Sequence, residues 1–313
     1  MAGRKRFALL AEFGVLLALA AEMGTFSALS PYFFTSENIL NVSLQTSIIA
    51  IIAAGMTFVI LTAGIDLSVG SVVAFTGVIA TALLRIELPL AAALGLAVLA
   101  GLGVGTLSGA FAGVLITKLN ITPFIATLAL MTIWRGAAFL ITDGRPIWDL
   151  PEGFDQIAGA RALGVPVPTI IMLAVFIAGY VVLTRTPFGR YVYAVGGNRE
   201  AARLAGIRTD RVIMGVYVLC GFLAALSGVL LASRLNSGQP NSGLMYELDV
   251  IAAVVVGGTS LFGGRGSIIG TFVGAMLIGV LRNGLNLLNV SSYLQMIFVG
   301  AVILLAVALD RFR

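Results

Sequence analysis

Residues 185–211, RTPFGRYVYAVGGNREAARLAGIRTDR, form the one long, strongly charged interruption in a chain that is otherwise mostly apolar. This stretch carries six arginines against Glu200 and Asp210, and apolar runs long enough to cross a bilayer lie on both sides of it. Within it, Asn198 fits the N-cap of a short helix and Gly206 fits its stop. The pattern therefore predicts a charged loop between two membrane spans, with a short helix in the loop.

The composition extends this prediction to the whole chain. Of its 313 residues, 59% are hydrophobic and only 11% are charged, whereas an ordinary soluble domain is about 25% charged. Several apolar runs exceed the roughly 18–20 residues that a spanning helix needs. The sequence therefore predicts an all-α, polytopic membrane protein, in which residues 1–313 form a single transmembrane domain embedded in lipid.

The apolar runs predict about ten spans, and the basic residues orient them. Thirteen of the nineteen lysines and arginines fall on one side of this arrangement, and basic residues collect in cytoplasmic loops. We therefore expect loop 185–211 and both termini in the cytoplasm, and the long acidic loop 143–167 outside. The predicted spans are 7–29, 44–63, 68–84, 89–117, 122–142, 168–184, 212–233, 249–262, 267–288 and 292–309.

Several classes of function are excluded by what the sequence lacks. The net charge of +5 is explained by the cytoplasmic loops, so no nucleic-acid partner is expected. The chain has no histidine, Cys220 is its only cysteine, and it has no GxxxxGK[ST] segment of the kind that binds nucleotide. We therefore expect no metal site, no catalytic residue and no ATP hydrolysis in this chain, and an intramembrane enzyme would lack a catalytic motif.

Two glycine-rich turns carry polar side chains where apolar runs fold back. Backbone left unpaired at membrane depth must be buried in protein or line a wet cavity. These side chains are therefore candidates for a translocation pathway, although Asp66 would equally serve as the N-cap of the following helix. The candidates are Asp66 and Ser68 in turn 64–71, and Thr259 and Ser260 in turn 257–267.

The two turns also point to internal repetition. Residues 53–84 and 251–281 both run from apolar through glycine-rich to apolar sequence. Both are predicted to fold back at a cytoplasmic turn in the same orientation, which suggests a parallel internal repeat of the kind common in transporters.

Charged and amide side chains inside predicted spans are further candidates, because burying them unpaired is costly. Arg135 lies in the middle of its span, where either an intramembrane partner or a cavity wall is expected. The other charged side chains lie near span ends, where they would reach the interface. The amides, on one helical face, would either bond neighbouring helices or line the pathway. These residues are Glu12, Glu22, Arg135, Arg282, Asn283 and Asn286.

Glycines spaced four apart predict close helix packing. Such a row bares the helix backbone, so that another helix can approach it closely. A phosphate-binding role fails for the second row, because its spacing is wrong and no strand precedes it. The rows are Gly101, Gly105, Gly109 and Gly113 in the fourth span, and Gly266, Gly270 and Gly274 in the ninth.

Five stretches, spread over nearly the whole chain, match one known family. They are 46–71 (including GIDLSVGS), 122–136, 189–207, 246–271 (including YELDVIAAVVVGGTS) and 283–296. With them the chain resembles the permease subunits of ribose-type ABC sugar importers, and the two quoted motifs are quite specific to that family. Glu200-Ala-Ala followed by Gly206 resembles an element general to importer permeases, whose later Leu-Pro is absent here.

The resemblance implies a complete transport machine in the bacterial plasma (inner) membrane. ATP and Mg²⁺ would bind a separate cytoplasmic ABC ATPase with two nucleotide-binding halves, so this chain would hold no cofactor. A second permease copy would complete a homodimer, and a periplasmic or lipid-anchored sugar-binding protein would dock outside. Residues 198–207 would be the coupling helix that contacts the ATPase. The coupling residues would be Asn198, Arg199, Glu200, Ala201, Ala202, Arg203, Leu204 and Gly206.

An ion-coupled secondary carrier for a small neutral solute is the alternative hypothesis. It would need intramembrane acids or broken helices that bind a coupling ion. The predicted span interiors offer few acids, and this hypothesis gives loop 185–211 no role. The substrate class rests on the resemblance, which implies a monosaccharide with ribose expected first, although related permeases for xylose, arabinose or galactose keep the same motifs.

Overall fold

The computed structural model describes residues 2–310, and it describes their side chains except at 2–13, 303, 306, 307, 309 and 310. Within this part of the chain, a helix occupies each of the ten predicted ranges. These helices are α1 (Ala2–Leu29), α2 (Ser36–Leu61), α3 (Val69–Leu83), α4 (Leu90–Thr117), α5 (Pro123–Thr142), α7 (Val167–Arg185), α10 (Thr209–Leu235), α11 (Tyr246–Val256), α12 (Ile268–Leu287) and α13 (Ser292–Asp310).

Six of these helices are long and apolar enough to cross a membrane, judged by the length and composition of the described residues. They are α2, α4, α5, α7, α10 and α12. By contrast, α3 has only 15 residues and α11 only 11, which is too short to cross a 30 Å hydrocarbon core alone. The molecule is therefore a multi-pass helical membrane protein, and ten crossings remain a prediction.

The predicted span 249–262 is wrong at both ends. The helix there, α11, begins at Tyr246 and ends at Val256. It ends because Gly257 and Gly258 follow, and Gly258 has a φ of +91°, which no helix accommodates. The two predicted repeat units also differ in helix length, since the first pairs a long α2 with a short α3 and the second a short α11 with a long α12. A parallel repeat is therefore not evident in the helix lengths.

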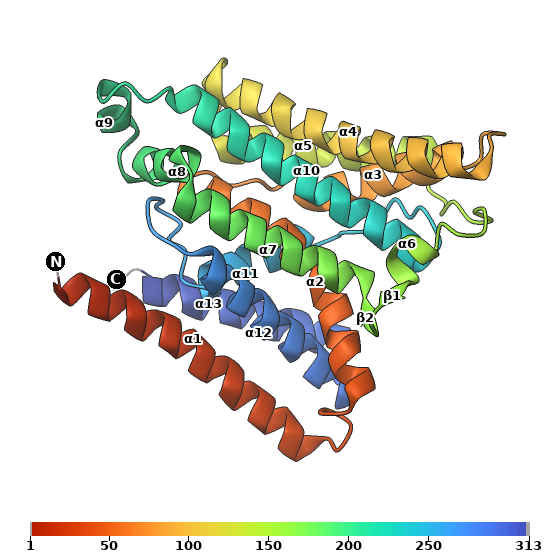
Figure 1. The fold of residues 1–313 in the computed structure, drawn as a ribbon, viewed down its shortest axis with the longest axis horizontal. Helices are drawn as coiled ribbons and strands as arrows, with labels where there is room; N and C mark the ends of the chain where they lie inside the picture. Colours follow the sequence, from red (N-terminus) through yellow and green to blue (C-terminus); the bar gives the residue numbers. More distant parts are fainter. Residues whose placement is uncertain (1, 311–313) are drawn as a thin grey trace.

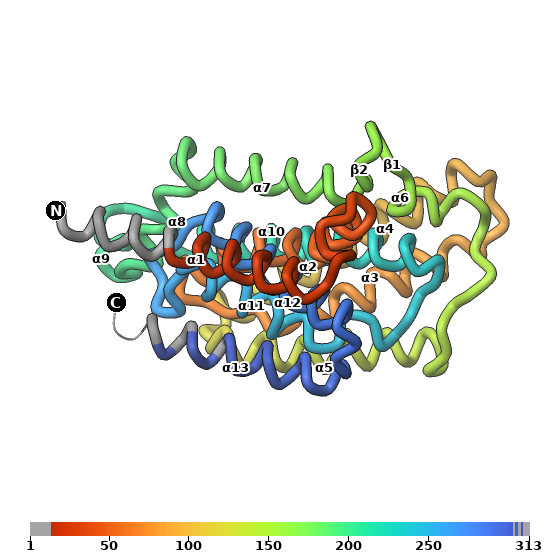
Figure 2. The backbone as a smooth tube through the Cα atoms, turned by 90° about the horizontal axis from the view of Figure 1, so that it is seen from below, coloured from red at the N-terminus to blue at the C-terminus, as the bar shows by residue number. Residues whose placement is uncertain are grey.

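The elements distribute between two ends of an elongated bundle (Figures 1 and 2). At one end lie the start of α1, the end of α13, and two further helices, α8 (Pro187–Gly197) and α9 (Arg199–Leu204). At the other end lie α6 (Gln156–Gly159) and a small hairpin of β1 (Arg161–Ala162) and β2 (Val165–Pro166). Loops 185–211 and 143–167 therefore lie at opposite ends, as the predicted topology requires.

The core is centred on α2 and α10, which contact one another and most of the other long helices. The glycine row of α4 faces α10. A Cβ added at Gly105 would lie 2.7 Å from the Gly221 carbonyl oxygen, and one at Gly109 would lie 3.0 Å from Val218 Cα. In the second row, Gly270 and Gly274 pack against α11, whereas Gly266 precedes α12 and belongs to the turn. Glycine therefore brings these helix backbones together.

Candidate functional site

Residues 185–211 fold into two helices, α8 and α9, joined by the single extended residue Asn198. The Asn198 side chain accepts a hydrogen bond of 2.9 Å from the Ala201 backbone N–H, which makes Asn198 the N-cap of α9. Gly206 follows α9 with a φ of +83°, a conformation that favours glycine. The N-cap and the stop that the sequence predicted are therefore both present.

Glu200 and Arg203 form a two-bonded ion pair on the exposed side of α9. Arg203 Nε donates to Glu200 Oε2 at 3.0 Å, and Arg203 Nη2 donates to Oε1 at 2.6 Å. These hydrogen bonds lower the pKa of the Glu200 carboxyl and raise the pKa of the Arg203 guanidinium. An exposed pair of this kind adds little to stability, so its charges are available to a partner protein.

The other side of α9 contacts the bundle. Arg199 Nη2 lies 3.1 Å from Asp210 Oδ1, at the start of α10. Ala202 is buried, whereas Leu204 is 75% exposed. The short helix is thus attached by one face and presents charged and apolar groups on the other.

Asp66 is buried, and its carboxylate organises the turn before α3. Asp66 Oδ1 accepts hydrogen bonds from the Ser68 backbone N–H at 2.9 Å and from Ser68 Oγ at 2.6 Å. Both residues are only 2% exposed. The Tyr217 hydroxyl donates to the neighbouring Ile65 carbonyl at 3.2 Å. The turn is therefore enclosed in protein, and a pathway role for Asp66 and Ser68 stays a prediction.

The second turn, between α11 and α12, is also closely packed. Thr259 is 1% exposed, and its Oγ1 has no hydrogen-bond partner among the described residues. Ser260 Oγ accepts a hydrogen bond of 3.3 Å from the Phe262 backbone N–H. Like the first turn, this one lies at the α9 end of the bundle (Figure 1).

Arg135 finds its partners in backbone carbonyls of a distant segment. Its Nη1 donates to the Pro240 and Ser242 carbonyl oxygens, at 2.7 Å each. These two residues belong to the segment that leads into α11. Arg135 therefore links this segment to α5, and a pathway role for Arg135 remains a prediction.

Arg282 makes a second internal charge contact, with Asp249. Arg282 Nη2 lies 2.7 Å from both carboxylate oxygens of Asp249, whose side chain is 3% exposed. This pair joins α11 to α12. Among the described side chains, Glu22 is partly buried and its Oε2 has no hydrogen-bond partner, whereas the side chain of Glu12 lies outside the described residues.

The amides of α12 bond neighbouring segments. Asn283 and Asn38 exchange two hydrogen bonds, of 3.0 Å and 2.9 Å. Asn286 Oδ1 accepts a hydrogen bond of 2.7 Å from Gln295 Nε2 of α13. Of the two roles expected for these amides, the structure therefore displays the helix-bonding one, and the pathway role remains a prediction.

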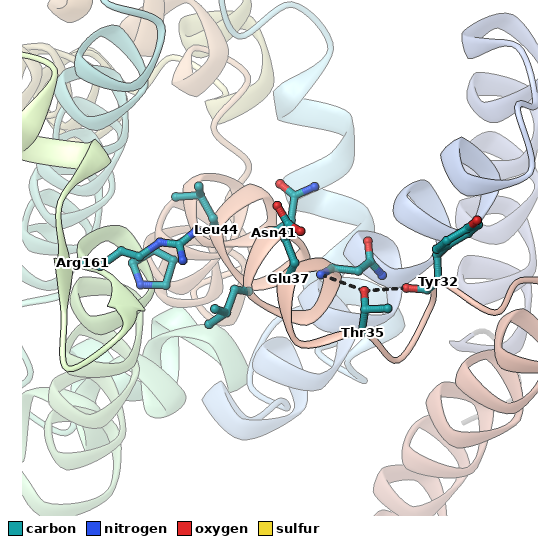
Figure 3. A pocket seen from close by; sticks show the side chains of 9 residues that line it. Tyr32, Thr35, Glu37, Asn41, Leu44 and Arg161 are labelled. Atoms are coloured by element: carbon teal, nitrogen blue, oxygen red, sulfur yellow. Dashed lines mark hydrogen bonds between the residues drawn. The ribbon is translucent and has the colours of Figure 1, made fainter.

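Two cavities lie at opposite ends of the bundle. One of about 410 Å³ lies at the α9 end, and its polar lining groups are Thr62, Asn120, Thr122, Arg199 and Tyr217. The other, of about 480 Å³, lies between the start of α2 and the β1–β2 hairpin, where Glu37 and Arg161 face it (Figure 3). In this second cavity Thr35 Oγ1 donates a hydrogen bond to the Tyr32 carbonyl and accepts one from the Asn38 backbone N–H.

Comparison with known proteins decides the family. A family model described as the permease component of branched-chain amino acid transport systems matches residues 38–307, which is most of the chain. The chain belongs to this permease family. No solved structure matches it.

Similar proteins match nearly the whole length of the permease. The ribose import permease protein RbsC of Haemophilus influenzae is 50% identical over 95% of this chain and 92% of its own length. RbsC of Escherichia coli K12 is 48% identical over 99% of this chain and 98% of its own length. RbsC of Bacillus subtilis is 48% identical over 95% of this chain and 94% of its own length.

Sequence reasoning missed the contacts that gather at the end of α8 in this permease. Tyr193 Oη donates a hydrogen bond of 3.0 Å to the Gly266 carbonyl, and Gly264 N–H donates one of 2.9 Å to the Leu61 carbonyl. The available signal was the glycine pairs 196–197 and 263–264, since adjacent glycines permit close backbone approach. The pairing itself joins segments far apart in sequence, which no local pattern specifies.

Proposed function

We propose that this permease is the transmembrane subunit of an ATP-binding cassette importer that carries a monosaccharide, ribose first. The observation that carries the proposal is α9, a capped helix at one end of the bundle whose exposed charges would be accessible to a partner protein. The sugar is supported by the relatives, which are ribose import permeases at 48–50% identity over nearly their whole length. The partner would be a cytoplasmic ATPase that binds and hydrolyses ATP with Mg²⁺.

The proposed topology has ten crossings, with both termini in the cytoplasm of a bacterial cell and the chain in its inner membrane. It is supported by the alternating directions in which the ten helices follow one another (Figure 1). The β1–β2 hairpin would then face the outside, where Leu163 is fully exposed with a φ of +54°. A sugar-binding protein would dock over this end, beside the cavity that Glu37 and Arg161 face.

A second copy of the permease would cover the face flanked by α5 and α13. These helices lie along the same edge of the bundle in Figure 2 and are separated in Figure 1. The segment that Arg135 of α5 binds leads into α11, and α11 contacts α13. In and after this segment Leu244 and Leu248 are exposed, and Glu247, like Arg135, is half-buried. Charged groups at membrane depth are costly against lipid, so a protein surface or a wet pathway fits this face better.

The second candidate function is an ion-coupled carrier. It is favoured by one observation, the buried carboxylate of Asp66, which forms none of the three ion pairs found among the described residues. A buried acid of this kind could bind a coupling ion. This candidate predicts accumulation of sugar in vesicles that contain the permease alone, driven by an imposed ion gradient.

The test is reconstitution of the permease in vesicles with its ATPase and a ribose-binding protein. We expect uptake only with all three components and ATP, and no accumulation under an ion gradient without the ATPase. Glu200→Lys should abolish both ribose uptake and the ribose-stimulated part of ATP hydrolysis, because it reverses the charge that α9 presents. Normal uptake by Glu200→Lys would refute the coupling role of α9.

A charge swap separates a partner contact from helix stability. The double variant Glu200→Arg, Arg203→Glu keeps an ion pair within α9 but exchanges the positions of its charges. If the pair served only to hold the helix, the swap would restore uptake. We expect it to stay inactive, because the ATPase would still meet the wrong charge at each position.

A further inference from the structure

Three segments distant in sequence meet backbone to backbone where α8 ends. The Leu61 carbonyl, at the end of α2, accepts a hydrogen bond of 2.9 Å from Gly264 N–H in the turn between α11 and α12. A Cβ added at Gly196 of α8 would overlap the Leu61 carbonyl oxygen and lie 2.6 Å from Gly264 N. We call Leu61, Gly196, Gly263 and Gly264 the glycine junction.

The junction leaves no room for side chains on its turn side either. A Cβ at Gly263 would lie 2.8 Å from Ala63 N and 2.9 Å from the Gly196 carbonyl oxygen. One at Gly264 would lie 2.8 Å from Gly197 Cα. The two turn glycines also have φ values of +80° and +70°, which other residues rarely adopt. Because packed backbones cannot compress, displacing α8 here must displace both turns.

The end of α8 is in turn coupled closely to α9. The Asn198 N–H donates a hydrogen bond of 3.1 Å to the Ala194 carbonyl of α8, and the Asn198 side chain caps α9. Only Asn198 lies between Gly197, the last residue of α8, and Arg199, the first residue of α9. One turn earlier in α8, Tyr193 Oη donates a hydrogen bond of 3.0 Å to the Gly266 carbonyl. Burial raises the pKa of Tyr193, so its hydroxyl stays protonated and remains a donor. Only Gly197 and Asn198 separate α9 from Gly196, so a movement of α9 is passed directly to the junction.

The two turns at the junction adjoin α3 and α11. Among the described helices that occupy predicted spans, these two are the shortest. The turn after Leu61 passes through Asp66 into α3, and the turn before α12 follows directly on α11. Irregular segments adjoin these short helices: residues 62–68 precede α3, and residues 257–267 follow α11. The two helices are the elements whose tilt or shift would open or close a path, since irregular backbone at membrane depth marks such paths in transporters.

We propose that Gly196 is the positioning residue through which movement of α9 reaches α3 and α11, by way of the glycine junction. This inference rests on the proposed function, because it assumes that an ATPase moves α9. Gly196 touches neither sugar nor ATP. It acts by holding the end of α8 against Leu61 and Gly264 at a distance that only glycine permits.

The test compares neighbouring glycines of α8 in the reconstituted transporter. Gly196→Ala adds a methyl group that must displace the Leu61 carbonyl, whereas Gly197→Ala adds one where nothing lies within 4 Å. We expect Gly196→Ala complexes to hydrolyse ATP but to import about ten-fold less ribose per ATP. Gly197→Ala should stay within about two-fold of the unaltered permease. A merely structural role would lower the amount of assembled complex and leave this ratio unchanged.

A spin label reports the movement itself. Phe262 in the turn is 79% exposed and the single native thiol is buried, so Phe262→Cys can be labelled alone. The ATP-dependent change in label mobility should persist with Gly197→Ala and vanish with Gly196→Ala. If Gly196→Ala does not assemble, Tyr193→Phe replaces it, because it removes one hydrogen bond without a clash and should lower the same ratio.

The outcomes separate the two claims. An assembled Gly196→Ala complex with a normal ratio and a normal label response overturns the inference, and so does a normal Tyr193→Phe complex where Gly196→Ala fails to assemble. Failure of the unaltered permease to bind any ATPase overturns the proposed function instead.

Discussion

Asp66 is the residue that distinguishes the two possible driving forces. It is buried, and its carboxylate oxygen Oδ1 accepts both the N–H and the hydroxyl of Ser68. If ATP hydrolysis by a partner supplies the energy, the carboxylate serves only as an acceptor that shapes the turn. If an ion gradient supplies it, the charge itself is required.

Asp66→Asn keeps an acceptor oxygen and removes the charge. We expect ATP-driven ribose uptake within about five-fold of the unaltered permease, because a neutral acceptor still bonds Ser68. Uptake is measured in vesicles and normalised to the amount of folded permease. Asp66→Leu removes the acceptor as well and should lower the amount of folded protein. Complete loss of uptake by well-folded Asp66→Asn would contradict ATP-driven import and favour the carrier.

Arg282 and Asp249 test the cost of internal charge. The carboxylate is almost fully buried and both its oxygens face the guanidinium. Arg282→Met should destabilise the folded permease by about 3 kcal/mol, because it leaves a buried charge without its partner. The double variant Arg282→Met, Asp249→Leu should recover much of this loss, since an apolar pair leaves no uncompensated charge. Thermal unfolding of both variants in detergent is the measurement, and equal destabilisation would show that the pair does not act as a unit.

At the scale of elements, α4 is placed by its glycines. Their row faces α10, where the two helix backbones touch. The sequence predicted this packing from the four-residue spacing, but not the partner, because a bare helix face is complementary to any other closely approaching helix.

Two glycines of α4 form a matched pair. A Cβ at Gly109 would clash with the Tyr217 carbonyl, while one at Gly103 would meet nothing within 4 Å. Gly109→Ala should lower the free energy of unfolding by about 1–3 kcal/mol, because it overpacks the contact. Gly103→Ala should cost nothing. Thermal unfolding in detergent compares them, and equal stabilities would contradict the packing of α4 on α10.

The sequence predicted that each long helix exists, but it did not predict where the helix α11 begins and ends inside the bundle. Asn198 and Gly206 set the ends of α9 through local hydrogen bonding and a local φ, so the sequence predicted them. The start of α11 at Tyr246 was missed. The segment before it is held by Arg135 of α5, more than a hundred residues away, and such an anchor has no local sequence signal.

At the scale of the whole molecule, α13 and α7 lie on opposite edges of the bundle (Figure 2). This placement makes the proposed homodimer testable, because only one edge would face the second copy. Ile297 of α13 and Ile177 of α7 are both 66% exposed, so they offer equivalent sites on the two edges.

Ile297→Cys should form an intermolecular disulfide under mild oxidation, and Ile177→Cys should not. The reason is that a cysteine near the proposed twofold contact meets its own copy, whereas one on α7 meets lipid. The native thiol of Cys220 is buried, so the unaltered permease should form no disulfide-linked dimer. Gel mobility without reductant measures the result. Cross-linking of Ile177→Cys alone would place the interface on α7 instead.

The sequence by itself determined the class of this protein, the approximate positions of the ten helices and the short helix in loop 185–211. These follow from apolar runs, charge asymmetry and capping residues, all of which act over a few neighbouring positions. Only the tertiary structure decided where Arg135 and Arg282 find their partners, which helix receives the α4 glycines, and that α8, α2 and the turn at 257–267 meet at Gly196. Those contacts join segments far apart in the chain, and their geometry depends on how all the helices pack at once.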